Sequence, residues 1–107
     1  MSEQAFETLA DSLLESLEEE IDDAELQGGV LTIDGEDGTW VVNKHAPTRQ
    51  VWLSSPKSGA RHYAFDAGSG LWKDTRGSGD LLSTLSGELG VVVFAWTRPN
   101  AGRMRRR

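Results

Sequence analysis

Acidic side chains recur at helical spacing near the start of the chain, where they could bind a cation. Between Phe6 and Asp23 they return every three or four positions, so one face of an α-helix would carry them. Carboxylates on successive turns lie about 5–6 Å apart, which lets two share a hard cation but not enclose it. We therefore expect weak, partly hydrated sites with little selectivity among iron, manganese, calcium and magnesium. The candidate metal-binding residues are Glu7, Asp11, Glu15, Glu18, Glu19, Asp22 and Asp23.

The acidic face is costly for the helix that carries it. Pairs such as Glu7 and Asp11 repel across one turn, and together the repulsive pairs cost the isolated helix about 1–3 kcal/mol. No Lys or Arg precedes Lys44, so the helix itself supplies no compensating base. A merely soluble surface would explain the acids but not this absence. The pattern favours a face that binds a cation or a basic protein, without deciding between them.

A second candidate surface surrounds Trp52, in a segment that reads as a strand from Gln50 to Ser54. Side chains alternate along a strand, so Val51 and Leu53 would face the core while Trp52 faces the other way. Antiparallel sheets often leave one face in water, and Trp is enriched in binding hot spots. Trp52 is therefore a candidate interface anchor. The alternative, that it packs on neighbouring aliphatic stems, fits the pattern equally well.

Residues for other chemistries are scarce. The chain has no cysteine, which excludes disulfides, thiolate nucleophiles and Cys-ligated metal centres. His45 and His62 share no metal-ligand spacing and read as surface residues. No Gly-x-Ser-x-Gly elbow or phosphate-binding glycine loop is present. Binding is thus a better interpretation than nucleophilic catalysis.

The elements that must position these residues follow from hydrophobic periodicity. An apolar arc runs through residues 6–21 opposite the acids, and Ser2 is a plausible N-cap. A turn at residues 34–38 and a hairpin loop at residues 67–70 separate alternating segments, and Asp80 can cap a second helix. The 107 residues suffice for one domain. The pattern predicts an α+β, two-layer α–β sandwich, with two terminal helices on one face of an antiparallel sheet. The predicted helices are 6–23 and 81–89, and the predicted strands are 30–33, 39–43, 50–54, 62–66 and 71–73.

The chain changes character at Gly90, so we expect a domain at residues 1–89 and an atypical segment at residues 90–107. Residues 91–96 form an apolar, strand-like run. A basic tail follows, with Arg98, Arg103, Arg105, Arg106 and Arg107. We interpret it as a disordered end. The alternatives are binding to nucleic acid or an anionic membrane, or folding back onto the acidic helix.

Charge limits the partners of the folded part. The net charge is −6, and thirteen of the seventeen acids lie at or before Asp37. We expect this part to repel nucleic acid, and no segment is long and apolar enough for a membrane span. The acidic N-terminus is unlike an organelle transit peptide, so either no presequence exists or the form is processed or truncated.

The segment from Asn43 to Gly59, read NKHAPTRQVWLSSPKSG, closely resembles the frataxin family, and its eukaryotic branch in particular. Residues 30–33 and 38–42 add to the resemblance, which extends from about Phe6 to Leu89. The family fold is an α–β sandwich, in agreement with the pattern.

The resemblance implies an iron-binding protein that assists iron–sulfur cluster assembly as an iron chaperone and as a regulator of a cysteine desulfurase–scaffold complex. Iron, as Fe²⁺ or Fe³⁺, would bind weakly on the acidic helix, which would also contact the desulfurase. The open sheet face would contact the scaffold protein, with Asn43 and Trp52 at matching positions. It further implies the mitochondrial matrix and a monomer, with iron-induced oligomers as an alternative. The candidate partner-binding residues are Asn43, His45, Gln50, Trp52, Arg61 and His62.

Two other functions stay open, namely ferroxidase or iron-storage activity and a generic acidic interaction module. The chain also departs from the family pattern. His45 replaces a usual Gln, His62 replaces a common Arg for which Arg61 could substitute, and residues 24–27 must supply any first strand. The usual continuation of the second helix is missing after Leu89. We therefore expect reduced stability or a different packing of the C-terminal segment.

Overall fold

The computed structural model describes residues 1–77, 79–91 and 93. Six strands follow one another in the sheet in chain order, each antiparallel to the next. The elements are α1 (Glu3–Glu20), β1 (Ala24–Gln27), β2 (Val30–Gly35), β3 (Gly38–His45), the 3-10 turn η1 (Ala46–Thr48), β4 (Gln50–Ser55), β5 (Gly59–Asp66), β6 (Leu71–Asp74) and α2 (Leu81–Leu89).

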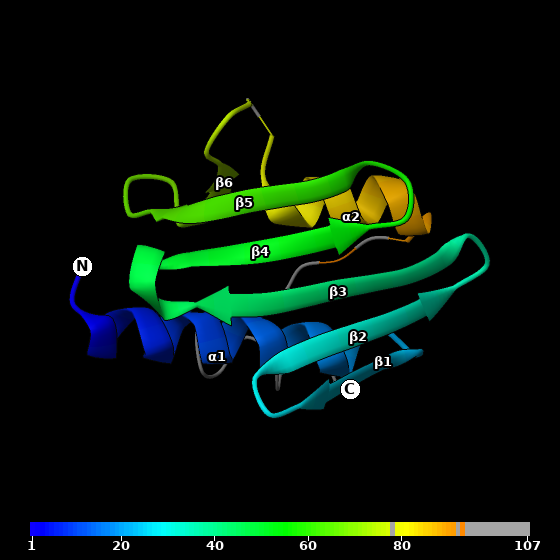
Figure 1. Cartoon of the computed structure of the whole chain (residues 1–107), viewed down its shortest axis with the longest axis horizontal. Coiled ribbons are helices and arrows are strands. Elements are labelled where there is room, and N and C mark those ends of the chain that lie inside the picture. The colour runs from blue at the N-terminus through cyan, green and yellow to red at the C-terminus, as the bar shows by residue number, and fades with distance from the viewer. Residues whose placement is uncertain (78, 92, 94–107) are drawn as a thin grey trace.

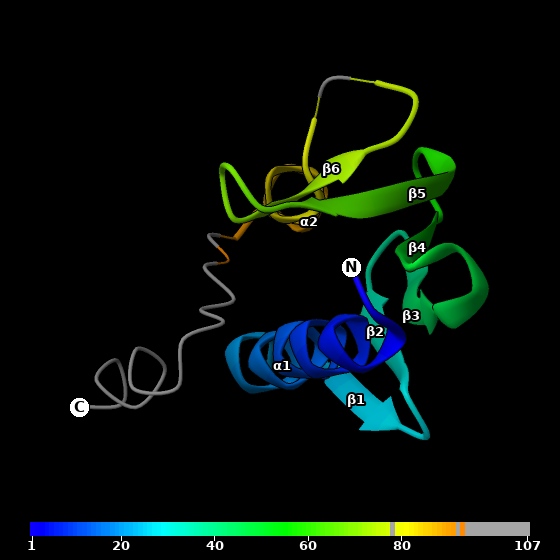
Figure 2. The same ribbon diagram turned by 90° about the vertical axis from the view of Figure 1, so that its left-hand side faces the viewer.

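Both helices lie on one face of the sheet, and no helix of the described residues covers the opposite face (Figure 1; Figure 2). In Figure 1, α1 and α2 run roughly along the direction of the strands, with α1 against β1 to β3 and α2 against β6. The predicted two-layer α+β sandwich is thus confirmed. No helix in the part of the chain that the structure describes could span a lipid bilayer.

The apolar stripe of α1 packs against the sheet. Ser2 accepts a hydrogen bond from the Ala5 backbone N–H at 3.0 Å, which confirms it as the N-cap. The helix ends three residues earlier than predicted, because Ile21 takes an extended conformation and turns its side chain into the core. Its buried residues are Phe6, Ala10, Leu13, Leu14 and Leu17.

Alternation along the strands builds the other half of the core. Val51 and Leu53 are 0% and 1% exposed and face the helices, whereas Trp52 between them lies on the open face. The predicted orientation of this strand is therefore confirmed. Residues 24–27 do supply the first strand, and the predicted strands are found with ends extended by one to three residues. The turns at Glu36-Asp37 and at residues 67–70 also lie where they were predicted.

Helix α2 spans the predicted residues, with the Asp80 carboxylate accepting a hydrogen bond from the Ser83 backbone N–H. It ends at Gly90, whose φ of 75° lies in the left-handed region that glycine tolerates. Val93 is buried, and its N–H donates to Ser86 Oγ at 3.1 Å. The predicted apolar strand at residues 91–96 and the basic tail fall largely or wholly outside the described residues.

One carboxylate of α2 joins the helix to two central strands. Glu88 Oε1 accepts hydrogen bonds from Trp40 Nε1 at 2.9 Å and from Ser55 Oγ at 2.6 Å. Burial alone would raise the pKa of Glu88. The hydrogen bonds from Ser55, Trp40 and Ser58 outweigh it and hold the pKa below its ordinary value. Glu88 is thus stabilised as an anion in the folded state.

We predict that Glu88→Ala lowers the free energy of unfolding by about 2 kcal/mol at pH 7, because the Trp40 and Ser55 donors lose their acceptor. The folded pKa is depressed, so the ionic contribution is present above the ordinary carboxyl pKa of 4.5 and is lost as the pH falls through the folded value. Urea unfolding at pH 7 and at pH 3.5 should show the gap between native chain and variant narrowing in acid. The control is Glu36→Ala in the exposed β2–β3 turn, expected to change stability by less than about 0.5 kcal/mol. An equal loss at both pH values would contradict the assignment.

Candidate functional site

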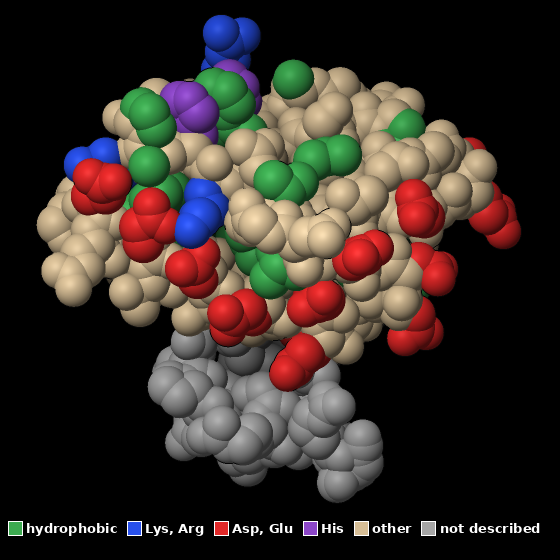
Figure 3. All heavy atoms as spheres, turned by 60° about the horizontal axis from the view of Figure 1, so that its bottom comes forward, with side chains coloured by type: hydrophobic (Ala, Val, Ile, Leu, Met, Phe, Trp, Pro, Cys, Tyr) green, Lys and Arg blue, Asp and Glu red, His purple; other side chains and the backbone are tan. Residues whose placement is uncertain are grey.

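The seven predicted metal-binding carboxylates form a band along α1 and the turn that follows it, which we call the acidic ridge. Glu15, Glu18 and Glu19 are exposed, while Glu7 and Asp11 are half-buried near the sheet. Figure 3 shows Asp and Glu side chains (red) spread across one face of the molecule, with the histidines (purple) at its upper edge. The apolar stripe of α1 points into the core, so its acids are held in solvent.

A lysine pairs with the acids at one end of the ridge. Lys44 of β3 places Nζ 2.8 Å from Asp11 Oδ1 and also pairs with Glu7. Hydrogen bonds to Asp11 and then Glu7 raise the pKa of Lys44, which therefore stays charged. The helix sequence alone implied an acidic face without any base. The fold corrects this, because strand β3 supplies one. A signal for it existed, since Lys44 is two residues from the buried Val42 and so points toward the helices.

Glu18 has a structural role as well. Its Oε2 accepts a hydrogen bond from the Leu26 backbone N–H at 2.9 Å. Leu26 belongs to β1, the edge strand of the sheet, and this N–H points away from β2. The ridge carboxylates farther along α1 and in the turn that follows it are Glu15, Glu19, Asp22 and Asp23.

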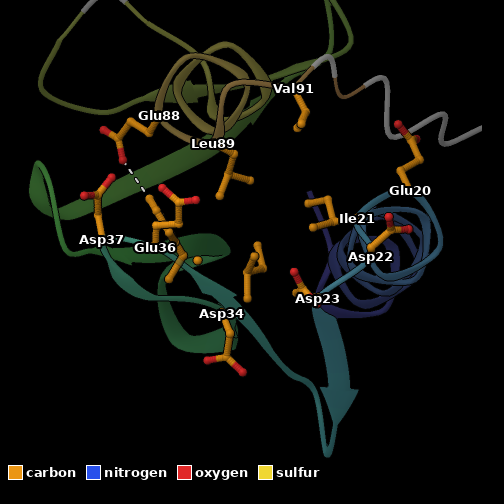
Figure 4. A pocket seen from close by; sticks show the side chains of 13 residues that line it. Glu20, Ile21, Asp22, Asp23, Asp34, Glu36, Asp37, Glu88, Leu89 and Val91 are labelled. Carbon is orange, nitrogen blue, oxygen red and sulfur yellow. Dashed lines mark hydrogen bonds between the residues drawn. The ribbon is translucent and has the colours of Figure 1, made fainter.

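A cleft of about 750 Å³ continues the ridge beyond the end of α1. In Figure 4, Asp22 and Asp23 lie on one side, Glu36 and Asp37 on the other, and Glu88 near the end of α2, while the Asp34 carboxylate points away from the cleft. Apolar side chains lie deeper in the same cleft. The sequence predicts residues 34–38 only as a turn, and it is the fold that brings Glu36 and Asp37 of this turn opposite the ridge. The cleft is lined by Glu20, Ile21, Asp22, Asp23, Ile33, Asp34, Gly35, Glu36, Asp37, Trp40, Glu88, Leu89 and Val91.

These carboxylates surround the cleft without converging. Within residues 1–77, 79–91 and 93, no three Asp, Glu or His side chains come close enough together to hold a metal ion. The donor set is therefore hard oxygen ligands arranged as separate exposed groups. It suits weakly held, partly hydrated cations rather than an enclosed metal centre.

The open face of the sheet brings together five of the six predicted partner-binding residues. Trp52 of β4 is directly opposite Asn43 of β3 and His62 of β5, and His45 is opposite Gln50. The rings of His45 and Trp52 stack with centroids 3.8 Å apart and planes 13° apart. Those of Trp52 and His62 stack at 4.2 Å and 11°. Trp52 thus packs between two imidazoles.

Local hydrogen bonds fix the polar groups around this stack. Trp52 Nε1 donates to Gln50 Oε1 at 2.9 Å, and Asn43 Nδ2 donates to the Lys44 carbonyl oxygen at 3.0 Å. The outward oxygen of Asn43 and the amide nitrogen of Gln50 have no hydrogen bond among the described residues. They are available to a partner.

Arg61 does not lie on this face. It is opposite Leu53, so alternation turns it to the helix side of the sheet. There its Nη1 is 3.0 Å from Asp74 Oδ2, and the backbone N–H of Arg76 together with Arg61 lowers the pKa of Asp74. Arg61 and Trp52 therefore lie on opposite faces of the sheet, because adjacent strand residues alternate. A role in partner binding at another surface stays a prediction.

A family model described as "Frataxin-like domain" matches residues 1–94 of this fold. The chain belongs to the frataxin family. The match extends five residues past the predicted domain limit at Leu89, and whether residues 90–107 form a separate segment stays a prediction. The eukaryotic resemblance agrees with the relatives that follow.

Three relatives show how far the similarity reaches. The chain is 44% identical over 79 residues to the mitochondrial frataxin homolog of Schizosaccharomyces pombe, covering 73% of this chain and 50% of that protein. It is 40% identical over 103 residues to a mitochondrial frataxin-like protein of Leishmania donovani, covering 82% and 54%. It is 34% identical over 97 residues to the iron–sulfur cluster assembly protein CyaY of Delftia acidovorans, covering 80% and 86%. The chain thus spans about half the length of the eukaryotic relatives.

Solved frataxins share the fold. A frataxin of Psychromonas ingrahamii superposes with a TM-score of 0.75 at 28% identity, covering 90% of this chain and 99% of that one. A trimeric frataxin of Saccharomyces cerevisiae, complexed with ferrous iron, gives 0.65 at 35% identity, covering 84% of each chain. Frataxin and CyaY proteins are iron–sulfur cluster assembly proteins.

We predict that Lys44→Gln opens the first part of the ridge to cations, because Glu7 and Asp11 lose the ammonium that neutralises them. Removing one adjacent positive charge should raise the affinity for Mn²⁺ there by about 1 kcal/mol, or about fivefold. Paramagnetic broadening of the Glu7 and Asp11 amide signals measures it. The matched control is Lys57→Gln, which removes an exposed pair with Asp37 at 3.2 Å. Unchanged broadening at Glu7 and Asp11 would show that Lys44 does not compete with the cation.

Proposed function

We propose that this protein binds iron weakly on its acidic ridge and docks onto a cysteine desulfurase–scaffold complex, where it acts as iron chaperone and regulator of cluster assembly. One observation carries the proposal, namely that a frataxin fold presents both a solvent-held acidic band and a half-buried Trp52 on the open face of the sheet. Family membership and the names of the relatives support the assembly role. The ferrous complex of the yeast frataxin supports iron as the cation.

The distribution of charge supports different roles for the two ends of the ridge. Lys44 already neutralises the Glu7 and Asp11 end, so iron is expected at Glu15, Glu19, Asp22 and Asp23, beside the acidic cleft. The carboxylates are separate and exposed, which fits a cargo that must be released again. The same negative band can attract a basic surface of the desulfurase, an interaction that salt should weaken.

The open sheet face supports the second contact. Trp52, Asn43 and Gln50 combine a large aromatic group with polar groups, a composition typical of binding hot spots. We assign this face to the scaffold protein. The eukaryotic relatives are named mitochondrial, so we place this protein in the mitochondrial matrix. We propose that it acts as a monomer, while the trimeric yeast frataxin supports iron-induced oligomers as the alternative.

We predict that Trp52→Ala weakens binding to the desulfurase–scaffold complex by at least about 2 kcal/mol, or about 30-fold, because a hot-spot aromatic is removed. Isothermal titration gives the affinity, and sulfide production by the same mixture gives the regulatory effect. Ser54→Ala, on the same face of β4, is the matched control and should change neither. If the native chain fails to alter sulfide production, the regulatory role is refuted.

We also predict that ferrous iron, added without oxygen, shifts or broadens amide signals from Glu15 to Asp23 more than any others. Combining Glu19→Gln, Asp22→Asn and Asp23→Asn should weaken this response at least about tenfold, because three of the seven ridge charges are lost. Glu3→Gln, in the first turn of the same helix, should leave it unchanged. A response spread evenly over the chain would contradict the ridge assignment.

A further inference from the structure

Two histidines cover Trp52 from both sides, which restricts how any partner can meet it. His45 lies against one face of the indole and His62 against the other, with ring planes within 13°. A partner therefore meets the edges of three stacked rings and not the flat face of the indole. Aromatic edges are electropositive, since the negative charge of the π system lies on the faces. The exposed edge of the stack thus favours acceptor groups.

Local hydrogen bonds orient one histidine of the stack. His45 Nδ1 lies 2.8 Å from Thr48 Oγ1, and either group can be the donor, depending on the tautomer of the ring. Thr48 Oγ1 also lies 3.3 Å from the His45 carbonyl oxygen. Among the described residues, neither Nε2 of His45 nor the ring of His62 has a hydrogen-bond partner, so these nitrogens are available to a partner.

Little in the described surroundings would compensate a positive charge on either ring. No ion pair of either histidine is found within the described part of the chain, and Lys44 points to the opposite face. The nearest acid along β5, Asp66, is held by the Ser69 hydroxyl at 2.6 Å and lies 3.8 Å from Lys73 Nζ. The charged groups on the open face or in the β3–β4 connection are Glu25 of β1, Asp34 of β2, Arg49 after η1, Asp66 of β5 and Lys73 of β6.

Protonation would change the charge of this surface without separating the stacked rings. An imidazolium stacked on an indole is attracted to the negative face of the ring, so the stack can survive the charge change. Histidine is the side chain that normally gains its charge between pH 5 and 8. Two added charges would make the Trp52 surface positive while the ridge stays negative. The surface would then prefer carboxylates.

We propose that the His45–Trp52–His62 stack is a proton-dependent docking surface whose partner is a carboxylate-bearing loop of the scaffold. The inference rests on the proposed function for the identity of that partner. Protonated, the stack offers N–H donors and positive charge along one exposed edge. Deprotonated, it keeps its shape and loses the charge. Docking through Trp52 is therefore tightest in mild acid.

The first test uses the intact chain without a partner. The Trp52 indole N–H signal and the ring signals of both histidines are followed by NMR from pH 5 to pH 8. We expect the Trp52 signal to titrate together with the histidines and to become flat in the His45→Gln/His62→Gln double variant. A flat Trp52 signal in the native chain would overturn the coupling on which the proposal depends.

The second test addresses the chemistry of the partner. Poly-glutamate added at pH 6 is expected to shift the signals of His45, Trp52 and His62, and to do so far less at pH 8. Poly-lysine is expected to shift ridge signals instead. If poly-glutamate leaves the stack unaffected at pH 6, or if the double variant responds equally, the carboxylate preference is refuted.

The third test separates this inference from the proposed function. Affinity for the desulfurase–scaffold mixture is measured at pH 6 and pH 8 for the native chain, the double variant and Ser54→Ala. At pH 6, two added charges near carboxylates should make the native chain and Ser54→Ala bind about tenfold more tightly than the double variant does. The same pH dependence in all three would overturn the proton switch alone. Absence of binding at both pH values would overturn the proposed function and, with it, the scaffold as partner.

Discussion

Burial of one face of each layer is the constraint on which the functional surfaces depend. The stripe from Phe6 to Leu17 packs on strands whose inward residues include Val51 and Leu53, all nearly without exposure. A helix that buries this stripe must hold its acids in solvent, although they repel one another. A strand that buries Val51 and Leu53 must turn Trp52 outward. Core formation thus stabilises two surfaces that would not be favoured on their own.

Much of the fold was predictable because local signals agreed with the final packing. Ser2 and Asp80 cap their helices as expected, and alternation placed Trp52 correctly. The end of α1 was set instead by tertiary packing, since Ile21 leaves the helix to enter the core. The shift is three residues. Periodicity describes a helix face but does not show where the chain must turn to begin the next strand.

The candidate site was less predictable, because it depends on strand register and on residues far apart in sequence. Ridge acids could be named from spacing alone, whereas the Lys44 contacts with Glu7 and Asp11 join β3 to α1. His45 and His62 looked unrelated until register placed them on either side of Trp52. Arg61 is the opposite case, because it is next to His62 in the sequence but lies on the other face of the sheet. Polar side chains carry little periodic signal by which such pairings could be foreseen.

The bond from the Leu26 N–H to Glu18 has a consequence for self-association. Exposed edge strands can pair with another chain, and proteins limit this by covering or charging the edge. Here a ridge carboxylate occupies an outward donor of β1, and its neighbours surround that edge with like charge. The acidic ridge is therefore also a guard against edge-to-edge aggregation. A cation that drew Glu18 away would expose this donor and reduce the negative charge around the edge, so both protections of the sheet edge would weaken at once.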